Sequence, residues 1–296
     1  MTQRPGNWGK WGDEDQRGTL NYITPEVTAA AAKLARTGRV YPLSIPLRAE
    51  APIWPGRHQN WHVAMHRNTQ GPGPGGAEDI LMIHTHGTTH MDALCHVFRD
   101  GTLYNGWNAA EHVTSRGATR NSIDNVGAIV TRGVLLDVPR HRGVPCVTHE
   151  TPIHGWELED ILTTRGIRLE PGDAVCVYAG REAWQAERPD TPYGRPFGPG
   201  PQERPGLHVS CLPFLRDHDV SVLVWDMLDH LPIGYDVPWA VHAALFAYGV
   251  GLVDNALLEP LAQACAEEGR DEFMLVVAPL KVVGGTGSPA NPLAVL

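Results

Sequence analysis

The chain has 296 residues, a formal net charge of −9, 42% hydrophobic residues and 19% charged residues. An acidic chain of this kind gives no electrostatic basis for binding nucleic acid or an anionic membrane, because those partners attract basic surfaces. The N-terminal stretch lacks the apolar core of a secretory signal, and no apolar run reaches the roughly 18 residues of a membrane span. The five cysteines form no C-x-x-C pair. We therefore expect a cytoplasmic protein with reduced thiols.

Predicted helices and strands alternate along the chain. A first helix is expected over 24–38, where Thr24 is a suitable N-cap, Pro25 takes the first helical position and Gly38 ends the helix. Two further helices are expected, over 156–167 and from Pro238 to Gly249. Strands are expected where apolar and β-branched residues gather, over 40–47, 79–87, 127–138, 173–180, 221–226 and 272–280, with a short one ending at Asp254. The alternation lacks repeats and low-complexity linkers, which predicts a single α/β domain over 1–296 with a mixed β-sheet flanked by helices.

A segment rich in proline and glycine, TQGPGPGGA at 69–77, interrupts this pattern. Such a composition is typical of a loop rather than of a helix or strand. Two interpretations remain open from the sequence: a mobile loop near the mouth of a pocket, or a plain surface connection.

Histidines are concentrated in HTHGTTHMDALCHVF, residues 84–98. His86, His90, Asp92 and His96 follow one another as H-x3-H, H-x-D and D-x3-H. Imidazole and carboxylate groups are the usual protein ligands of catalytic zinc, manganese or iron. The intervening Gly-Thr-Thr disfavours a helix, so we expect an irregular turn that leads into a strand or helix. A cluster of this size predicts a metal site rather than a set of surface histidines.

Other catalytic signatures are missing. Gly87 stands where a zincin has its glutamate, and no G-x-S-x-G nucleophile elbow occurs. Cys95 and His96 are adjacent, and adjacent side chains usually point apart, which disfavours a Cys/His nucleophile pair. The GGTGSP segment at 284–289 lacks the lysine and the following helix of a phosphate loop, so it predicts a structural turn.

The segment HGTTHMDALCHVF resembles the H-x-G-T-H-x-D-x-P-x-H-F signature of the cyclase family, which includes bacterial kynurenine formamidase, isatin hydrolase and certain polyketide ring cyclases. Three further segments, 11–26, 241–255 and 279–295, resemble patterns of its longer members. The chain departs from the signature in the position of the glycine and in Leu94, which replaces the usual proline. Asp254 stands where the family has a glutamate, and its side chain is one methylene shorter.

The resemblance implies a swivelling β/α fold, a homo-oligomer (dimer or tetramer) and one or two divalent ions, zinc or manganese. It implies that His86, His90 and Asp92 bind a first ion and that His96 accepts and donates protons. In two-metal members Asp92 would bridge to a second ion held by His242 and Asp254. In one-metal members the histidine at the position of His242 helps to hold the substrate instead.

The predicted reaction is hydrolysis of a C–N amide bond of formamide, imide or lactam type in a small molecule, with His96 as acid and base. Two other functions remain open from the sequence: a polyketide-type ring cyclase that uses His96 as a base, and a non-catalytic metal-binding protein. His96 could also serve only to orient Asp92.

Overall fold

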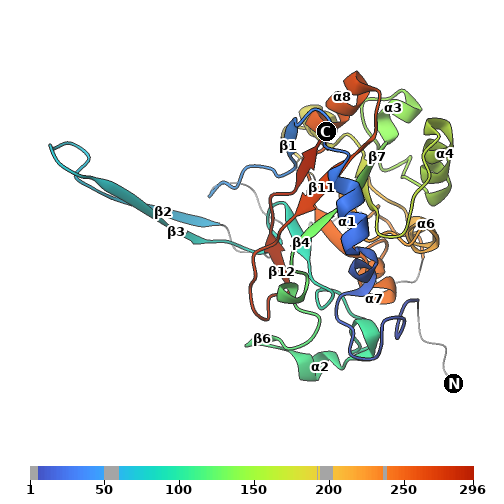
Figure 1. Ribbon diagram of the computed structural model, residues 1–296, viewed down its shortest axis with the longest axis horizontal. Helices are drawn as coiled ribbons and strands as arrows, with labels where there is room; N and C mark the ends of the chain where they lie inside the picture. Colours follow the sequence, from blue (N-terminus) through green and yellow to red (C-terminus); the bar gives the residue numbers. More distant parts are fainter. Residues whose placement is uncertain (1–5, 50–59, 192, 194–202, 236–238) are drawn as a thin grey trace.

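The computed structural model describes residues 6–49, 60–191, 193, 203–235 and 239–296. A nine-stranded mixed sheet flanked by helices forms the body of this described part (Figure 1), which confirms the predicted α/β architecture. Its strands, in spatial order, are β1 (Val40–Pro42), β13 (Leu293–Val295), β11 (Glu272–Val277), β7 (Ile129–Asp137), β8 (Ala174–Tyr178), β9 (Val222–Trp225), β10 (Gly251–Asp254), β4 (His90–Asp92) and β12 (Gly287–Pro289).

The four central strands, β7 to β10, run parallel, and the strands on both sides of them are antiparallel. Every residue of β8, β9 and β10 is buried. Parallel strands are covered on both faces, which explains why their sequences are nearly continuous apolar runs without alternation. This is why 173–180 and 221–226 could be predicted as strands.

Helices connect and cover these strands. The α-helices are α1 (Pro25–Ala32), α2 (Ala109–His112), α3 (Val138–Arg142), α4 (Gly155–Arg165), α5 (Arg181–Ala186), α6 (Cys211–Asp217), α7 (Ala243–Tyr248) and α8 (Glu259–Glu268). Short 3-10 helices span Gly18–Tyr22, Tyr104–Gly106 and Ile123–Asn125. None of the helices in the described part of the chain combines the length and apolar character needed to cross a membrane.

Two apolar cores lie on the two faces of the sheet. Alternate residues of one strand enter opposite cores: Val175 and Val177 pack with α4 and α6, while Ala174 and Cys176 pack with α8. This follows from the two-residue side-chain period of a strand. Trp225, at the end of β9, is among the largest fully buried side chains.

Several predicted boundaries were wrong. The first helix ends at Ala32 instead of Gly38, because the amides of Thr37 and Gly38 donate to the carbonyl of Leu296 and draw the chain toward the C-terminus. The strand expected over 40–47 is limited to Val40–Pro42, which pairs with β13. Prolines at 42 and 46 lack the amide hydrogen that would extend the ladder. The predicted helix start at Pro238 lies outside the described residues.

The predicted extent of the strand over 79–87 was also wrong. It ends at Met82 and forms a hairpin, β2 (Trp61–Arg67) with β3 (Gly76–Met82), that projects from the body as an arm (Figure 1). Residues 68–75 connect the two strands at the tip of the arm, so most of the Pro/Gly-rich segment is a connection far from the body. The described part also contains two short strands, β5 (Val113–Thr114) and β6 (Gly117–Ala118).

Gly133 in the centre of β7 is expected to be essential for stability. It lies directly opposite Phe273 in the ladder, and a Cβ atom at this position would lie 2.3 Å from the buried ring of Phe273. Gly133→Ala should lower the free energy of unfolding in chemical denaturation by about 1–3 kcal/mol, the usual cost of overpacking. Gly76→Ala, in a strand position with its nearest contact at 3.7 Å, is the control. Equal stability of the two variants would contradict this packing.

Candidate metal centre

The histidine-rich segment forms a tight turn followed by strand β4. The turn is closed by the amide of Gly87, which donates to the carbonyl of His84. β4 then lies between β10 and β12, with His90 opposite Asp254 and Asp92 opposite Leu252. His90 and Asp92 share one face of this strand, and Met91 points into the core on the other face. The strand therefore presents a histidine and a carboxylate side by side.

The carboxylate of Asp92 lies at the centre of the cluster and is buried. Its Oδ1 atom is 3.3 Å from Nε2 of His86 and 3.3 Å from Nε2 of His90. Its Oδ2 atom is 3.9 Å from Nε2 of His242 and 4.0 Å from Nε2 of His96. The two oxygens thus face two different pairs of imidazoles.

Asp254, at the end of β10, joins the same cluster. Its Oδ2 atom is 3.1 Å from Nε2 of His242 and 3.8 Å from Nε2 of His90. Its Oδ1 atom accepts a hydrogen bond of 2.5 Å from the indole of Trp225. One oxygen is thereby fixed by the neighbouring strand, and the other faces the histidines. The structure therefore brings together all six residues predicted from the sequence: His86, His90, Asp92, His96, His242 and Asp254.

Hydrogen bonds on the outer side of the rings orient the histidines. Nδ1 of His90 donates to the carbonyl of Thr88 at 2.6 Å, and Nδ1 of His242 donates to Asp229 at 2.6 Å. Nδ1 therefore carries a proton in both rings, and Nε2 is the atom that faces the carboxylates. Metal-ligating histidines almost always have such a partner for their second nitrogen.

The charges of the cluster are strongly coupled. Burial raises the pKa of Asp92, but the imidazoles of His96 and His90 outweigh burial and bring this pKa below its usual range. Burial lowers the pKa of His242, yet Asp229 and Asp254 hold it well above its usual value. The protein alone thus keeps a carboxylate ionised at the centre and a proton on a neighbouring ring. A divalent cation would replace such a proton, as metal binding to imidazole generally does.

The unsatisfied oxygens of Asp92 are the clearest indication that the cluster fits a cation. Among the described residues, neither oxygen has a hydrogen-bond donor in good geometry. A buried carboxylate without donors is unfavourable unless a positive charge compensates it. Asp92 belongs to two groups whose ligand atoms all lie within 4.8 Å of one another, His86 with His96 and His90 with Asp254. The donor set, imidazole and carboxylate, is the one that zinc and manganese accept.

A family model and several solved structures match the chain. Residues 41–230, more than half of the chain, match the family model Cyclase, described as "Putative cyclase". A crystal structure described as that of a novel cyclase is 32% identical, with 99% of this chain and 98% of that chain covered and a TM-score of 0.86. The chain belongs to the Cyclase family. The matched residues include His86 to His96 but end before His242 and Asp254.

More distant structures share the fold of this Cyclase-family chain. Isatin hydrolase A from Ralstonia solanacearum is 20% identical, with 92% of this chain and 98% of that chain covered and a TM-score of 0.62. A predicted metal-dependent hydrolase from Bacillus stearothermophilus is 19% identical, with 86% and 97% covered and a TM-score of 0.50. No curated protein matches the chain in sequence.

His96 is the most open member of the cluster, with 26% of its side chain exposed. Its ring stacks on His86, with centroids 4.0 Å apart. Burial lowers the pKa of His96, so its ring is neutral at neutral pH. Because it also belongs to one of the two ligand groups, the geometry is compatible with a ligand as well as with a base. Cys95 beside it is excluded as a nucleophile, because burial raises the pKa of its thiol to about 12.

Three further residues, outside the six predicted ligands and base, support the cluster. Asp229 accepts hydrogen bonds from the ring and the amide of His242, and Trp225 fixes Asp254. Both occur in or directly after β9, where polar groups at the carboxyl ends of parallel strands often form sites. Asp226, by contrast, accepts hydrogen bonds from the backbone amides of 179–181 and serves the start of α5.

Gly287 is the third such residue, in the segment that the sequence predicted as a structural turn. The turn ends before it, and Gly287 begins strand β12 beside Asp92. A Cβ atom here would lie 2.6 Å from Nε2 of His86 and 3.0 Å from the carbonyl oxygen of Met91. Only glycine therefore leaves room for His86 at the cluster.

Gly287→Ala should weaken divalent-metal binding with little change in the fold. The added methyl group displaces Nε2 of His86, and displaced ligand geometry typically costs about 10–100-fold in affinity. Calorimetric titration of zinc or manganese into chelator-treated protein measures the effect, with circular dichroism to check folding. Gly76→Ala again serves as the control. Unchanged affinity in Gly287→Ala would show that His86 does not bind through Nε2.

Proposed function

We propose that the protein is a metal-dependent hydrolase that cleaves a C–N amide bond of formamide, imide or lactam type in a small molecule. The observation that carries the proposal is the buried, ionised carboxylate of Asp92, which lacks donors among the described residues and faces the Nε2 atoms of four histidines. Membership in the Cyclase family and the fold shared with isatin hydrolase A support the choice of hydrolysis.

In this proposal His86, His90 and Asp92 hold a first divalent ion, zinc or manganese, and Asp92, His242 and Asp254 hold a second. A bound ion of this kind polarises a carbonyl group and lowers the pKa of water toward about 7. The separate orientation of the two Asp92 oxygens favours two ions. The hydrogen bond from Trp225 holds Asp254 so that the second carboxylate oxygen of Asp254 faces His242. This orientation offsets the fact that aspartate is one methylene shorter than the glutamate of the family at this position.

His96 acts as the base and acid. Its neutral ring accepts a proton from the attacking water, and the carbon of the carbonyl group gains a C–O bond. The same ring then returns the proton to the nitrogen as the C–N bond breaks, so that a carboxylic acid and an amine form. Its partly exposed position gives it access to a substrate that the more buried His90 and His242 do not have.

A second function is favoured by the similarity to the structure described as a novel cyclase. In that case His96 would remove a proton from a substrate carbon, and ring closure would follow without hydrolysis. The two functions differ in their products: only hydrolysis consumes one water per substrate.

All five cysteines are free and buried, which supports our placement of the protein in a reducing compartment such as the cytoplasm.

A panel of aryl formamides, cyclic imides and lactams tests the reaction class. With zinc- or manganese-loaded protein, we expect release of a carboxylate from at least one of these classes, detected by mass spectrometry in ¹⁸O-labelled water. Incorporation of the label identifies hydrolysis. Turnover of a polyketone substrate without incorporation would favour the ring cyclase, and a metal-loaded protein inert on all classes would contradict the proposal.

The role of His96 is tested by His96→Ala. The variant should retain metal but lose about 10²–10⁴-fold in kcat, the usual contribution of general acid–base catalysis. His90→Ala, which removes a proposed ligand, should lose metal as well as activity. His141→Ala, which removes a half-buried histidine outside the cluster that is paired with Asp160, is the control for histidine removal. If His96→Ala loses as much metal as His90→Ala, then His96 is a ligand and another group is the base.

A further inference from the structure

A second group of histidines lies outside the metal centre, on three short extended segments that pair in parallel. Ile153 pairs with Leu207, and Leu207 pairs with Asp229. The next residue of each segment is a histidine, and these three residues form what we call the histidine ladder: His154, His208 and His230. Because residues in register on neighbouring extended segments point to the same face, the three rings lie on one side of the pairing.

The rings of the histidine ladder are close to one another and partly open to solvent. The ring centroids of His154 and His208 are 4.5 Å apart, and those of His208 and His230 are 6.3 Å apart. His230 is 9% exposed, whereas the other two histidines are half-buried. The ladder thus has a buried end at His230 and two more accessible rings.

The ring of His208 presents an N–H group rather than a lone pair. Burial lowers the pKa of His208, and the neighbouring ring of His154 lowers this pKa further, so the His208 ring is neutral at neutral pH. The amide of Ser210 donates to Nδ1 of His208 at 3.1 Å, so the hydrogen of the neutral ring lies on Nε2. A metal ion requires a lone pair at the free nitrogen, whereas an anion requires a hydrogen there. The ring is therefore suited to an anion.

Ser210 also orients His154, the residue that precedes helix α4. The hydroxyl oxygen of Ser210 accepts a hydrogen bond of 3.2 Å from the amide of Gly155, and it lies 3.1 Å from Nδ1 of His154. The hydroxyl hydrogen is then free to be donated to that nitrogen, which leaves the hydrogen of a neutral ring on Nε2 here as well. The N-terminus of α4, a helix of 11 residues, carries a partial positive charge that favours an anion and disfavours a cation.

His230 gives an independent indication of a ligand. Its Nδ1 atom is buried and, among the described residues, has no hydrogen-bond partner in good geometry. A buried polar atom without a partner is unfavourable unless a ligand or a water molecule completes its hydrogen bond. His230 therefore offers a hydrogen-bonding atom that the described part of the protein does not itself use.

Exposed aromatic side chains flank the histidine ladder. Trp156 is 68% exposed, and its ring is stacked on that of His154, with centroids 5.9 Å apart and 14° between the planes. Tyr235 is 62% exposed, and its ring centroid lies 5.7 Å from that of His208. Aromatic side chains beside a few polar groups are typical of a site that holds the planar part of a small molecule.

Carboxylates of the surrounding segments already have partners. Glu157 of α4 forms an ion pair of 2.5 Å with Arg142. Glu203 lies 3.2 Å from Nε2 of His149. An anion at the ladder therefore meets little repulsion from these two groups.

We propose that the histidine ladder binds the oxyanion of a small molecule, a carboxylate or a phosphate, at a site separate from the metal centre. The N–H groups of the rings donate to the oxyanion, and Trp156 and Tyr235 contact the rest of the molecule. Consecutive residues of an extended segment point to opposite faces, so that His230 faces the ladder while Asp229 faces His242. The site uses none of the proposed metal ligands and does not require the ion.

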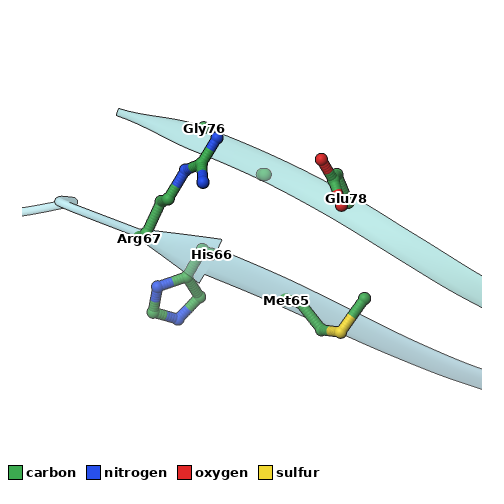
Figure 2. Close-up of a pocket in the computed structure, with 6 residues that line it drawn as sticks. Met65, His66, Arg67, Gly76 and Glu78 are labelled. Atoms are coloured by element: carbon green, nitrogen blue, oxygen red, sulfur yellow. The ribbon is translucent and has the colours of Figure 1, made fainter. Parts of the chain in front are cut away.

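Calorimetric titration of the metal-loaded protein with sodium benzoate, sodium acetate and inorganic phosphate tests this site. His208→Ala removes the N–H donor and should weaken binding of the tightest anion by about 10–100-fold, the value of a hydrogen bond to a charged group. His208→Gln, which keeps an N–H donor, should retain part of the affinity. His66→Ala is the control, because His66 is an exposed histidine beside Arg67 in the shallow pocket at the outer end of the arm (Figure 2).

The three anions also distinguish the sources of the oxyanion. Tighter binding of benzoate than of acetate identifies an aromatic acid, equal binding identifies an acid recognised through its carboxylate alone, and tighter binding of phosphate identifies a phosphorylated ligand. The proposal is overturned if none of the anions binds at millimolar concentration, or if His208→Ala and His66→Ala have equal effects. An affinity that depends on the metal ion and not on His208 would place the anion at the metal centre instead. An additional equivalent of zinc that is lost in His208→Ala would assign the ladder to a cation and would also contradict the proposal.

Discussion

The buried carboxylate of Asp92 is the constraint on which the site depends. It is ionised, has no hydrogen-bond donor in good geometry among the described residues, and lies within 4.0 Å of imidazole nitrogens from four histidines. Hydrophobic packing alone would not tolerate such a group, because an uncompensated charge in the interior costs several kcal/mol. Hydrogen bonds to the Thr88 carbonyl and to Asp229 orient the rings of His90 and His242, so that their Nε2 atoms face this carboxylate. The same arrangement suits a divalent cation.

The mixed sheet makes this arrangement possible. β4 is inserted between β10 and β12, which places Asp254 and Gly287 on either side of His90 and Asp92. The parallel strand β9 delivers Trp225 and, beyond its end, Asp229 to the same place. Residues from positions 86 to 287 thereby meet within one small volume, although no local segment contains more than four of the six candidate site residues. The long-range strand pairing therefore determines which carboxylates reach the histidines.

Much of this could be predicted from the sequence, for identifiable reasons. The buried parallel strands are recognisable in the sequence as apolar runs. The residue types and the spacing of His86, His90, Asp92 and His96 are enough to indicate a metal site. His242 and Asp254 were predicted through the family resemblance, because the approach of Asp254 to the cluster depends on the long-range antiparallel pairing of β10 with β4. Gly287 and the arm were missed. A glycine in a three-residue strand has no local signal, and the weak alternation of 79–82 does not reveal that the hairpin lacks a covering element.

Metal content with and without the central carboxylate tests the account most directly. The wild type and Asp92→Asn are purified without chelator, and zinc and manganese are measured by mass spectrometry on the same samples used for activity. Asparagine keeps the shape of the side chain but removes its charge, which is the feature that attracts the cation. The account predicts at least one equivalent of divalent metal in the wild type and a loss of metal and turnover together in Asp92→Asn, with the fold retained. A metal-free wild type that remains active, or an Asp92→Asn variant that binds metal as tightly as the wild type, would contradict it.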